Sequence, residues 1–161
     1  MNFLGKTPDV FVLGESPGRE EDAVGKCFIG QAGKMLDDNM SVISNEYCYD
    51  NTVRCFSDHK PTVDEIKACR TFWESRVKEV DPKIIVALGA YAAEAILGGK
   101  VMMEDVVGSI RKVNLAGKIR TVIFNYHPAF ILRLQGAKGI EYQRKLNAYA
   151  DVWSVVKQYV E

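Results

Sequence analysis

The sequence contains no long hydrophobic run. Its apolar stretches are short and interrupted by charged residues, whereas a membrane-spanning helix needs about 20 consecutive apolar residues. The first ten residues, MNFLGKTPDV, also lack the apolar segment of a signal peptide. We therefore expect a soluble, cytoplasmic protein that has no membrane partner.

Net charge is missing as well, because 21 Lys and Arg residues balance 21 Asp and Glu residues. This balance neither supports nor excludes a nucleic-acid partner, since a small enzyme can concentrate its basic groups on one face. Residues 133–145 contain four basic side chains and one acid. A DNA-binding surface and an ordinary solvated helix face both explain that local excess.

The C-x-x-C motif is absent, although the chain has four cysteines, at positions 27, 48, 55 and 69. Without a secretion signal, disulfides are not expected. Taken alone, the spacing of the four cysteines indicates ordinary buried thiols and no metal site.

What the sequence does contain is typical of a globular protein. Of its 161 residues, 47% are apolar and 26% are charged. The length suits one domain with a single core, which we expect to span residues 1–161. No repeat or low-complexity tract is visible.

Strand-like and helix-like segments alternate along the chain. The predicted strands are 9–14, 46–55, 83–89 and 119–125. The predicted helices are 34–43, 61–80, 90–97, one from about 128, and 139–160. Thr62 and Glu65 have the spacing of a capping box at a helix start. The alternation predicts a mostly parallel sheet covered on both faces.

Open sheets of this kind bind ligands at the carboxyl ends of their strands. Gly14 and Glu15, Asn51 and Gly89 stand at three of the predicted ends, and residues 125–127 stand at the fourth. The last of these is His127, followed by Pro128 at a predicted helix start. The arrangement is typical of an enzyme.

Six motifs, taken in order, resemble the family 4 uracil-DNA glycosylases. They are GESPGREED (14–22), FIGQAGKMLD (28–37), DNTVRC (50–55), DEIKAC (64–69), PKIIVALGAYAAEAIL (82–97) and YHPAFILR (126–133). The resemblance covers about residues 9–135. It implies an α/β fold, a three-layer α/β/α sandwich around a four-stranded parallel sheet. It also implies a monofunctional glycosylase that hydrolyses the N-glycosidic bond of a flipped-out deoxyuridine and leaves an abasic site. Nothing in the sequence demands more than one copy of the chain, so we expect a monomer.

The reaction makes the sugar cationic and the base anionic at the transition state, so the protein must hold the base and stabilise both charges. The resemblance makes Phe28 the platform on which the base stacks. Asn51 carries an amide that fits the O4 and N3–H edge of uracil, whereas cytosine reverses those groups. A mismatch of that kind can reject an analogue by as much as about 10⁴- to 10⁵-fold. A neutral His127 would donate to uracil O2, a contact worth about 3 to 4 kcal/mol.

Glu15 and Glu21 are the candidate catalytic carboxylates. One could position water and either could stabilise the cationic sugar, and the sequence does not divide these roles. Gly14 and Ser16 belong to a tight loop that we expect to bind the substrate. The residues that we expect to contact DNA are Pro17, Gly18, Lys34, Pro128 and Arg133.

The chain departs from the family at its cysteines. Family 4 enzymes hold a [4Fe–4S] cluster with four of them, and Cys55 and Cys69 match two of the four. No residue before the first strand is cysteine, and Cys27 and Cys48 are misplaced for the remaining pair. We therefore predict no iron–sulfur cluster, no other cofactor and no metal.

The loop after Cys55, FSDHKP, also differs from the proline- and asparagine-rich segment of the family. In one subgroup a histidine of this loop becomes covalently attached to DNA, but we interpret His59 as an exposed loop histidine. Two alternatives stay open. One is a catalytically inactive member of the fold that binds DNA or a replication or repair protein, and the other is a glycosylase for a different damaged base.

Overall fold

The computed structural model describes residues 8–43, 47–137 and 139–161. Its centre is a sheet of five strands in the order β2-β1-β3-β5-β4. Their bounds are Val10–Gly14 for β1, Tyr47–Asn51 for β2, Ile84–Leu88 for β3, Ile110–Leu115 for β4 and Lys118–Asn125 for β5. The four strands predicted from sequence are β1, β2, β3 and β5, and these four run parallel.

The prediction of four strands was wrong by one. β4 pairs antiparallel with β5 through a two-residue turn, in which Ala116 has φ 53° and Gly117 has φ 78°. Two consecutive positive φ values match the twist of a tight hairpin. β4 escapes a search for buried strands because it is an edge strand, and most of its side chains, including Arg111 and Lys112, are exposed. Charged side chains on an edge strand discourage pairing with other molecules.

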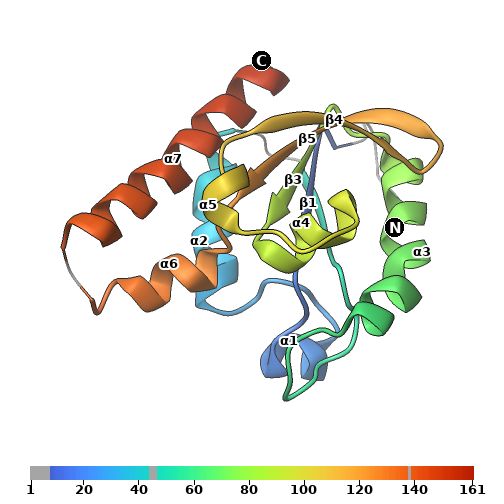
Figure 1. Cartoon of the computed structure of the whole chain (residues 1–161), viewed down its shortest axis with the longest axis horizontal. Helices are drawn as coiled ribbons and strands as arrows, with labels where there is room; N and C mark the ends of the chain where they lie inside the picture. The colour runs from blue at the N-terminus through green and yellow to red at the C-terminus, as the bar shows by residue number, and fades with distance from the viewer. Residues whose placement is uncertain (1–7, 44–46, 138) are drawn as a thin grey trace.

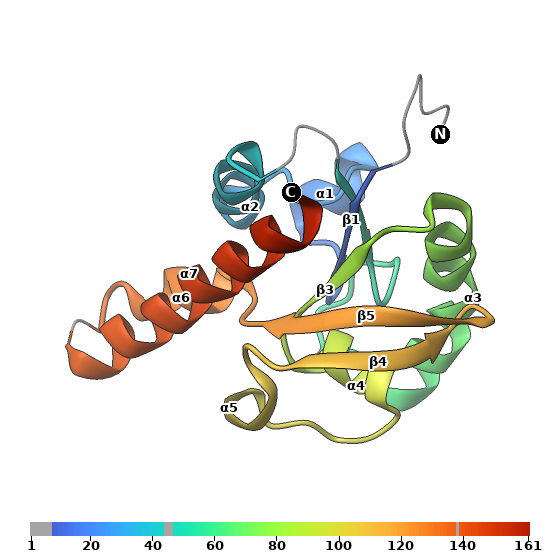
Figure 2. The ribbon, with the colours of Figure 1, turned by 90° about the horizontal axis from the view of Figure 1, so that it is seen from above.

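Helices cover both faces of the sheet, as the sandwich prediction requires (Figure 1, Figure 2). One core cluster packs α3 (Val63–Val80), α4 (Ala90–Leu97) and the short α5 (Met103–Val106) against one face. A second cluster packs α2 (Gln31–Ser41), α6 (Pro128–Leu134) and α7 (Ile140–Val160) against the other. The three-layer α/β/α architecture is thus confirmed. None of the described helices is long and apolar enough to cross a membrane.

The capping box expected at the start of the long helix is present. The Thr62 side chain accepts a hydrogen bond from the Glu65 backbone, and the Glu65 carboxylate accepts one from the Thr62 backbone. Both bonds satisfy N–H groups that a helix start would otherwise leave unpaired. They also fix the end of the loop that precedes α3, which borders the site described next.

The parallel strands bring distant parts of the sequence to one edge of the sheet. Gly14 of β1 pairs directly with Asn51 of β2, and Leu88 of β3 pairs with Asn125 of β5. The loops that follow these residues therefore lie side by side. α1 (Arg19–Val24) and the start of α6 lie on the same side of the molecule (Figure 1).

Candidate active site

A cavity of about 400 Å³ opens at the carboxyl ends of the strands. That volume is in the usual range for small-molecule sites. Most of the residues predicted for the site line it: Glu15, Ser16, Pro17, Gly18, Glu21, Phe28, Asn51, His127 and Arg133. The remaining lining residues are Ala32, Ala129 and the loop 56–60.

Three predicted residues lie outside this lining. Gly14 lies at the end of β1, beneath Phe28 and Asn51. Lys34 is exposed on α2. Pro128 is buried as the first residue of α6. A DNA contact by the Pro128 ring therefore stays a prediction that its burial does not favour.

His127 is the cap of α6, and this position explains the histidine before the proline. Its Nδ1 accepts a hydrogen bond from the Ala129 N–H at 3.1 Å. An accepting Nδ1 places the proton of the neutral ring on Nε2, which is then a donor for the cavity. Desolvation, together with the positive charges of Arg133 and Lys60, lowers the pKa of His127 to about 4. The imidazole is therefore a neutral donor at physiological pH.

Phe28 and His127 lie face to face across part of the cavity. Their ring centroids are 6.0 Å apart and their planes differ by 23°. Tyr49 supports the Phe28 ring from a second side, edge to face, at 5.3 Å between centroids. Phe28 is nearly buried, and its backbone is in the left-handed region with φ 53°. Surrounding residues hold this unusual conformation and so fix the position of the ring beside the cavity.

Two glycines make room for Phe28. A Cβ on Gly14 would lie 2.5 Å from Phe28 Cζ and 2.8 Å from Asn51 Oδ1. A Cβ on Gly33 would lie 1.6 Å from the Phe28 carbonyl oxygen, a clash with backbone that a side-chain movement cannot relieve. Sequence reasoning missed Gly33. It stood in the motif FIGQAGKMLD, just before the predicted helix 34–43, and the structure places it inside α2, where glycine is unfavourable unless packing requires it.

Asn51 is 4% exposed and is held by several contacts at the end of β2. Its backbone N–H donates to the buried Asp50 carboxylate at 2.8 Å, and Asp50 is paired with Arg54 and Arg76. Its Nδ2 donates to Cys27 Sγ at 3.5 Å. Because a thiol is a weak acceptor, the amide keeps most of its hydrogen-bonding capacity for a ligand. Asp50 and Cys27 are positioning residues that the sequence did not reveal.

The two candidate carboxylates have different surroundings. Glu21 Oε1 accepts a hydrogen bond from the Gly30 N–H at the start of α2, at 3.2 Å, so it ties α1 to α2. Gly18 permits this approach, since a Cβ there would lie 2.4 Å from Glu21 Oε2. The carbonyl oxygen of Glu15 accepts from the Val53 N–H at 3.0 Å, and its carboxylate contacts Lys60 Nζ at 3.4 Å. The Glu21 carboxylate therefore connects two helices, whereas the Glu15 carboxylate contacts the exposed Lys60 side chain.

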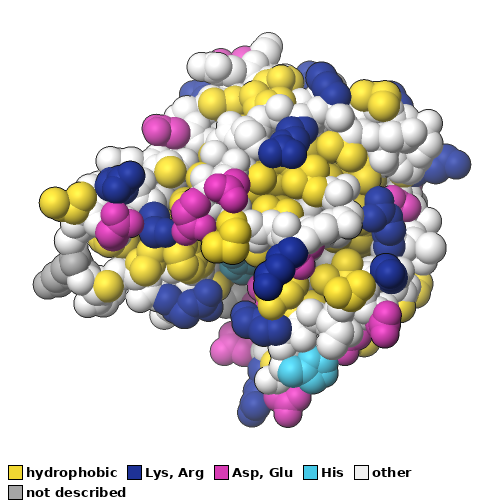
Figure 3. Space-filling model, viewed as in Figure 1, with side chains coloured by type: hydrophobic (Ala, Val, Ile, Leu, Met, Phe, Trp, Pro, Cys, Tyr) yellow, Lys and Arg dark blue, Asp and Glu magenta, His cyan; other side chains and the backbone are white. Residues whose placement is uncertain are grey.

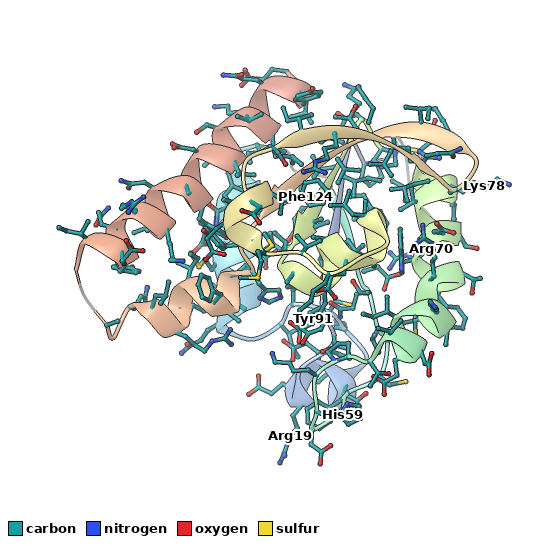
Figure 4. All side chains as sticks on the ribbon, viewed as in Figure 1. Arg19, His59, Arg70, Lys78, Tyr91 and Phe124 are labelled. Atoms are coloured by element: carbon teal, nitrogen blue, oxygen red, sulfur yellow. The ribbon has the colours of Figure 1, made fainter. Side chains whose placement is uncertain are left out.

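The loop 56–60 forms one wall of the cavity. Figure 4 shows His59 on this loop, beside α1, and Tyr91 above it. His59 Nδ1 lies 2.9 Å from the Lys60 carbonyl oxygen, and Nε2 lies 3.5 Å from Glu65 Oε1. The His59 side chain is exposed, as predicted. Sequence reasoning did not single out Lys60, because a lone exposed lysine has no pattern.

The cysteines do not fit an iron–sulfur cluster. Such a cluster needs four converging thiolates, and Cys55 is exposed while Cys48 is buried and accepts from Arg76 at 2.9 Å. Among the described residues, no three His, Cys, Asp or Glu side chains converge as metal ligands. The absence of a cluster stays a prediction, and no chemical step below uses one.

Sequence comparison relates the chain to known enzymes. A model of the Uracil DNA glycosylase superfamily matches residues 1–151. A type-4 uracil-DNA glycosylase of Pyrobaculum aerophilum is 31% identical over 146 residues, which cover 85% of this chain and 74% of that protein. Another, of Thermotoga maritima, is 38% identical over 135 residues, or 77% of this chain and 66% of that protein.

Proposed function

The chain belongs to the uracil-DNA glycosylase superfamily, and we propose that it hydrolyses the N-glycosidic bond of deoxyuridine in DNA and leaves an abasic site. The relatives are named type-4 uracil-DNA glycosylases. One observation carries the proposal: a platform (Phe28), a buried amide (Asn51) and a neutral imidazole (His127) line one cavity. An aromatic ring, an amide and a neutral donor are what a uracil base and its developing charge require.

In this proposal the deoxyuridine leaves the helix and its base stacks on Phe28. The Asn51 amide then pairs with O4 and N3–H, which cytosine cannot match. As the glycosidic bond breaks, its electron pair moves onto the base, and negative charge collects on O2. The His127 Nε2–H donates to O2 and stabilises that charge.

The sugar left behind is cationic, and water must attack its C1′. We assign the stabilisation of this cation to Glu15, because Glu21 is already bonded to the start of α2. The water oxygen forms the new bond to C1′, and its proton is released to solvent or to a carboxylate. We also propose that the protein acts as a monomer, which light scattering on the purified protein checks.

The test is excision from a uracil-containing oligonucleotide, followed by alkali to cut the abasic product. We expect cleavage with the wild type. His127→Ala should lower kcat by about 10²- to 10³-fold, as for other single transition-state donors. Asn51→Ala should also lose activity, whereas Asn114→Ala, an exposed asparagine on β4, should not.

Two outcomes of this assay contradict the proposal. DNA binding without cleavage would indicate an inactive DNA-binding member of the fold. Cleavage of an oligonucleotide that carries a different damaged base, with no cleavage at uracil, would replace the substrate.

A further inference from the structure

The lining of the cavity raises an electrostatic problem for a DNA substrate. It contains three carboxylates, those of Glu15, Glu21 and Asp58, but only two permanent cations, Lys60 and Arg133. A DNA strand carries a negative phosphate on each side of every nucleotide. Binding a flipped nucleotide here requires cations at the mouth of the cavity, and Lys60 and Arg133 are the ones that its lining offers.

Lys60 lines the cavity and has most of its side chain in solvent. Its side chain is 68% exposed, and Nζ lies 3.4 Å from Glu15 Oε1. Nζ also lies 6.0 Å from the centre of the Tyr91 ring, in the first turn of α4. Figure 3 shows Lys and Arg side chains interspersed with Asp and Glu over the lower centre of this face of the molecule. Exposed ion pairs of this kind contribute little to stability. A competing anion can therefore replace Glu15 as the partner of Lys60.

The loop itself has contacts on two sides. The Phe56 N–H donates to Asp22 at 3.4 Å, and Arg19 stands 5.7 Å from the centre of the Phe56 ring. On the other side, His59 connects the loop to Glu65 in the capping box of α3. The loop therefore holds the base of the Lys60 side chain at the rim while the ammonium end can change partners.

We propose that Lys60 exchanges Glu15 for a phosphate of the substrate strand, next to the flipped nucleotide. The exchange rests on the proposed glycosylase function. Before DNA arrives, Lys60 partly neutralises Glu15 and keeps it from repelling the strand. After the exchange, the Glu15 carboxylate faces the sugar with its full negative charge and can stabilise the cation that forms when the glycosidic bond breaks. Lys60 is thus a DNA-binding and positioning residue, and DNA binding itself completes the catalytic site.

The first test is the salt dependence of DNA binding, measured by fluorescence anisotropy on a single-stranded oligonucleotide with a non-cleavable abasic analogue. Loss of one phosphate contact should reduce the slope of log Kd against log salt by about 0.7. We expect this reduction for Lys60→Gln and the wild-type slope for Lys60→Arg. Lys78→Gln, which removes a charge in the last turn of α3, is the matched control (Figure 4).

The second test replaces a single phosphate, on either side of the analogue, with a neutral methylphosphonate. At one of the two positions the replacement should weaken binding by the wild type and have little effect on Lys60→Gln. Equal effects on both proteins at both positions would overturn the phosphate contact.

The third test concerns Glu15. Removing its charge should tighten DNA binding, because Lys60 no longer has a competing partner. Glu15→Gln should therefore bind more tightly than the wild type, and the gain should be smaller when Lys60→Gln is also present. Equal gains in both backgrounds would contradict the exchange.

Kinetics separate this proposal from the glycosylase proposal. With uracil-containing substrate, Lys60→Gln should raise KM and leave kcat within about twofold, since Glu15 is free of Lys60 in both bound complexes. A fall in kcat at unchanged KM would overturn the exchange while leaving the glycosylase function intact. No excision by the wild type would instead overturn the function, whereas the binding tests would still report on Lys60.

Discussion

The two histidines of the chain show how position decides the chemistry of a side chain. His127 is half-buried in the lining of the cavity, and desolvation is the main cause that lowers its pKa to about 4. His59 is exposed, and its bond to the Lys60 carbonyl together with the charge of Glu65 raises its pKa. Near pH 5.5, His59 should carry a proton and His127 should not. The residue that we assign to catalysis is the one that stays neutral.

This difference predicts that the imidazole rings of His59 and His127 titrate at clearly different pH values. The folded pKa of His127 lies below the ordinary value of 6.5, so its unfolded form binds a proton first as pH falls. Its contribution to the free energy of unfolding is complete above pH 6.5 and decreases by up to about 3 kcal/mol as pH falls toward 4. Imidazole ¹⁵N NMR should show one ring titrating above 6.5 and the other near 4, with its proton on Nε2.

The control is His127→Gln, in which the low titration should vanish and the loss of stability between pH 6.5 and 4 should be smaller. The pH–rate profile of excision should show no change in slope near pH 6.5 that comes from His127. A His127 that titrates at or above 6.5 would contradict the neutral donor.

Phe28 offers a second prediction at the scale of one residue. A base stacked on an aromatic ring gains about 1 to 3 kcal/mol. Phe28→Leu keeps much of the apolar volume and removes the π face, so we expect KM to rise by about 5- to 150-fold. The measurement is steady-state excision, with the melting temperature as the check on folding. Phe72→Leu, an exposed phenylalanine on α3, should leave KM unchanged.

At the scale of the element, α2 positions Phe28 through Gly33. We expect Gly33→Ala to lower the free energy of unfolding by about 1 to 3 kcal/mol, because the new Cβ overlaps the Phe28 carbonyl. Excision should fall with it, since relief of the clash moves the platform. Urea denaturation and the excision assay measure both effects.

Gly99→Ala is the matched control, because a Cβ there meets nothing within 4 Å. It should change stability by less than about 0.5 kcal/mol. A Gly33→Ala protein as stable and active as Gly99→Ala would show that α2 does not hold the platform.

The elements also show what the sequence can and cannot predict. The capping box of α3 depends on residues three positions apart, so Thr62 and Glu65 revealed it directly. β4 forms by pairing with another strand, and most of its side chains are exposed, so its sequence lacks the apolar run that identifies a buried strand. The tight turn at Ala116 and Gly117, between β4 and β5, implies a strand on each side.

For the whole molecule, the sequence predicted the α/β sandwich and the edge of the sheet at which the site lies. Parallel strands place their carboxyl ends together whatever the details of packing, so the strand ends, taken together with the family motifs, led to Glu15, Asn51 and His127. Gly33, Cys27 and Lys60 were not, because their roles arise from contacts between segments that are distant in the sequence.

The arrangement of the cysteines makes a prediction about the whole protein. We expect the purified protein to be colourless and to contain no stoichiometric iron, since its thiols do not converge. A Cys55→Ser/Cys69→Ser variant should keep wild-type excision and stability. Iron analysis and the absorption spectrum test this, and a brown protein that loses its colour and fold in the double variant would contradict it.

The central claim is that side chains from four separate segments form one pyrimidine-binding cavity. The most direct measurement is a crystal structure with an oligonucleotide whose deoxyuridine resists cleavage. We predict a flipped uracil that stacks on Phe28, pairs with the Asn51 amide and accepts from His127 Nε2 at O2. A uracil bound elsewhere, or a cavity that stays closed to the base, would contradict the account.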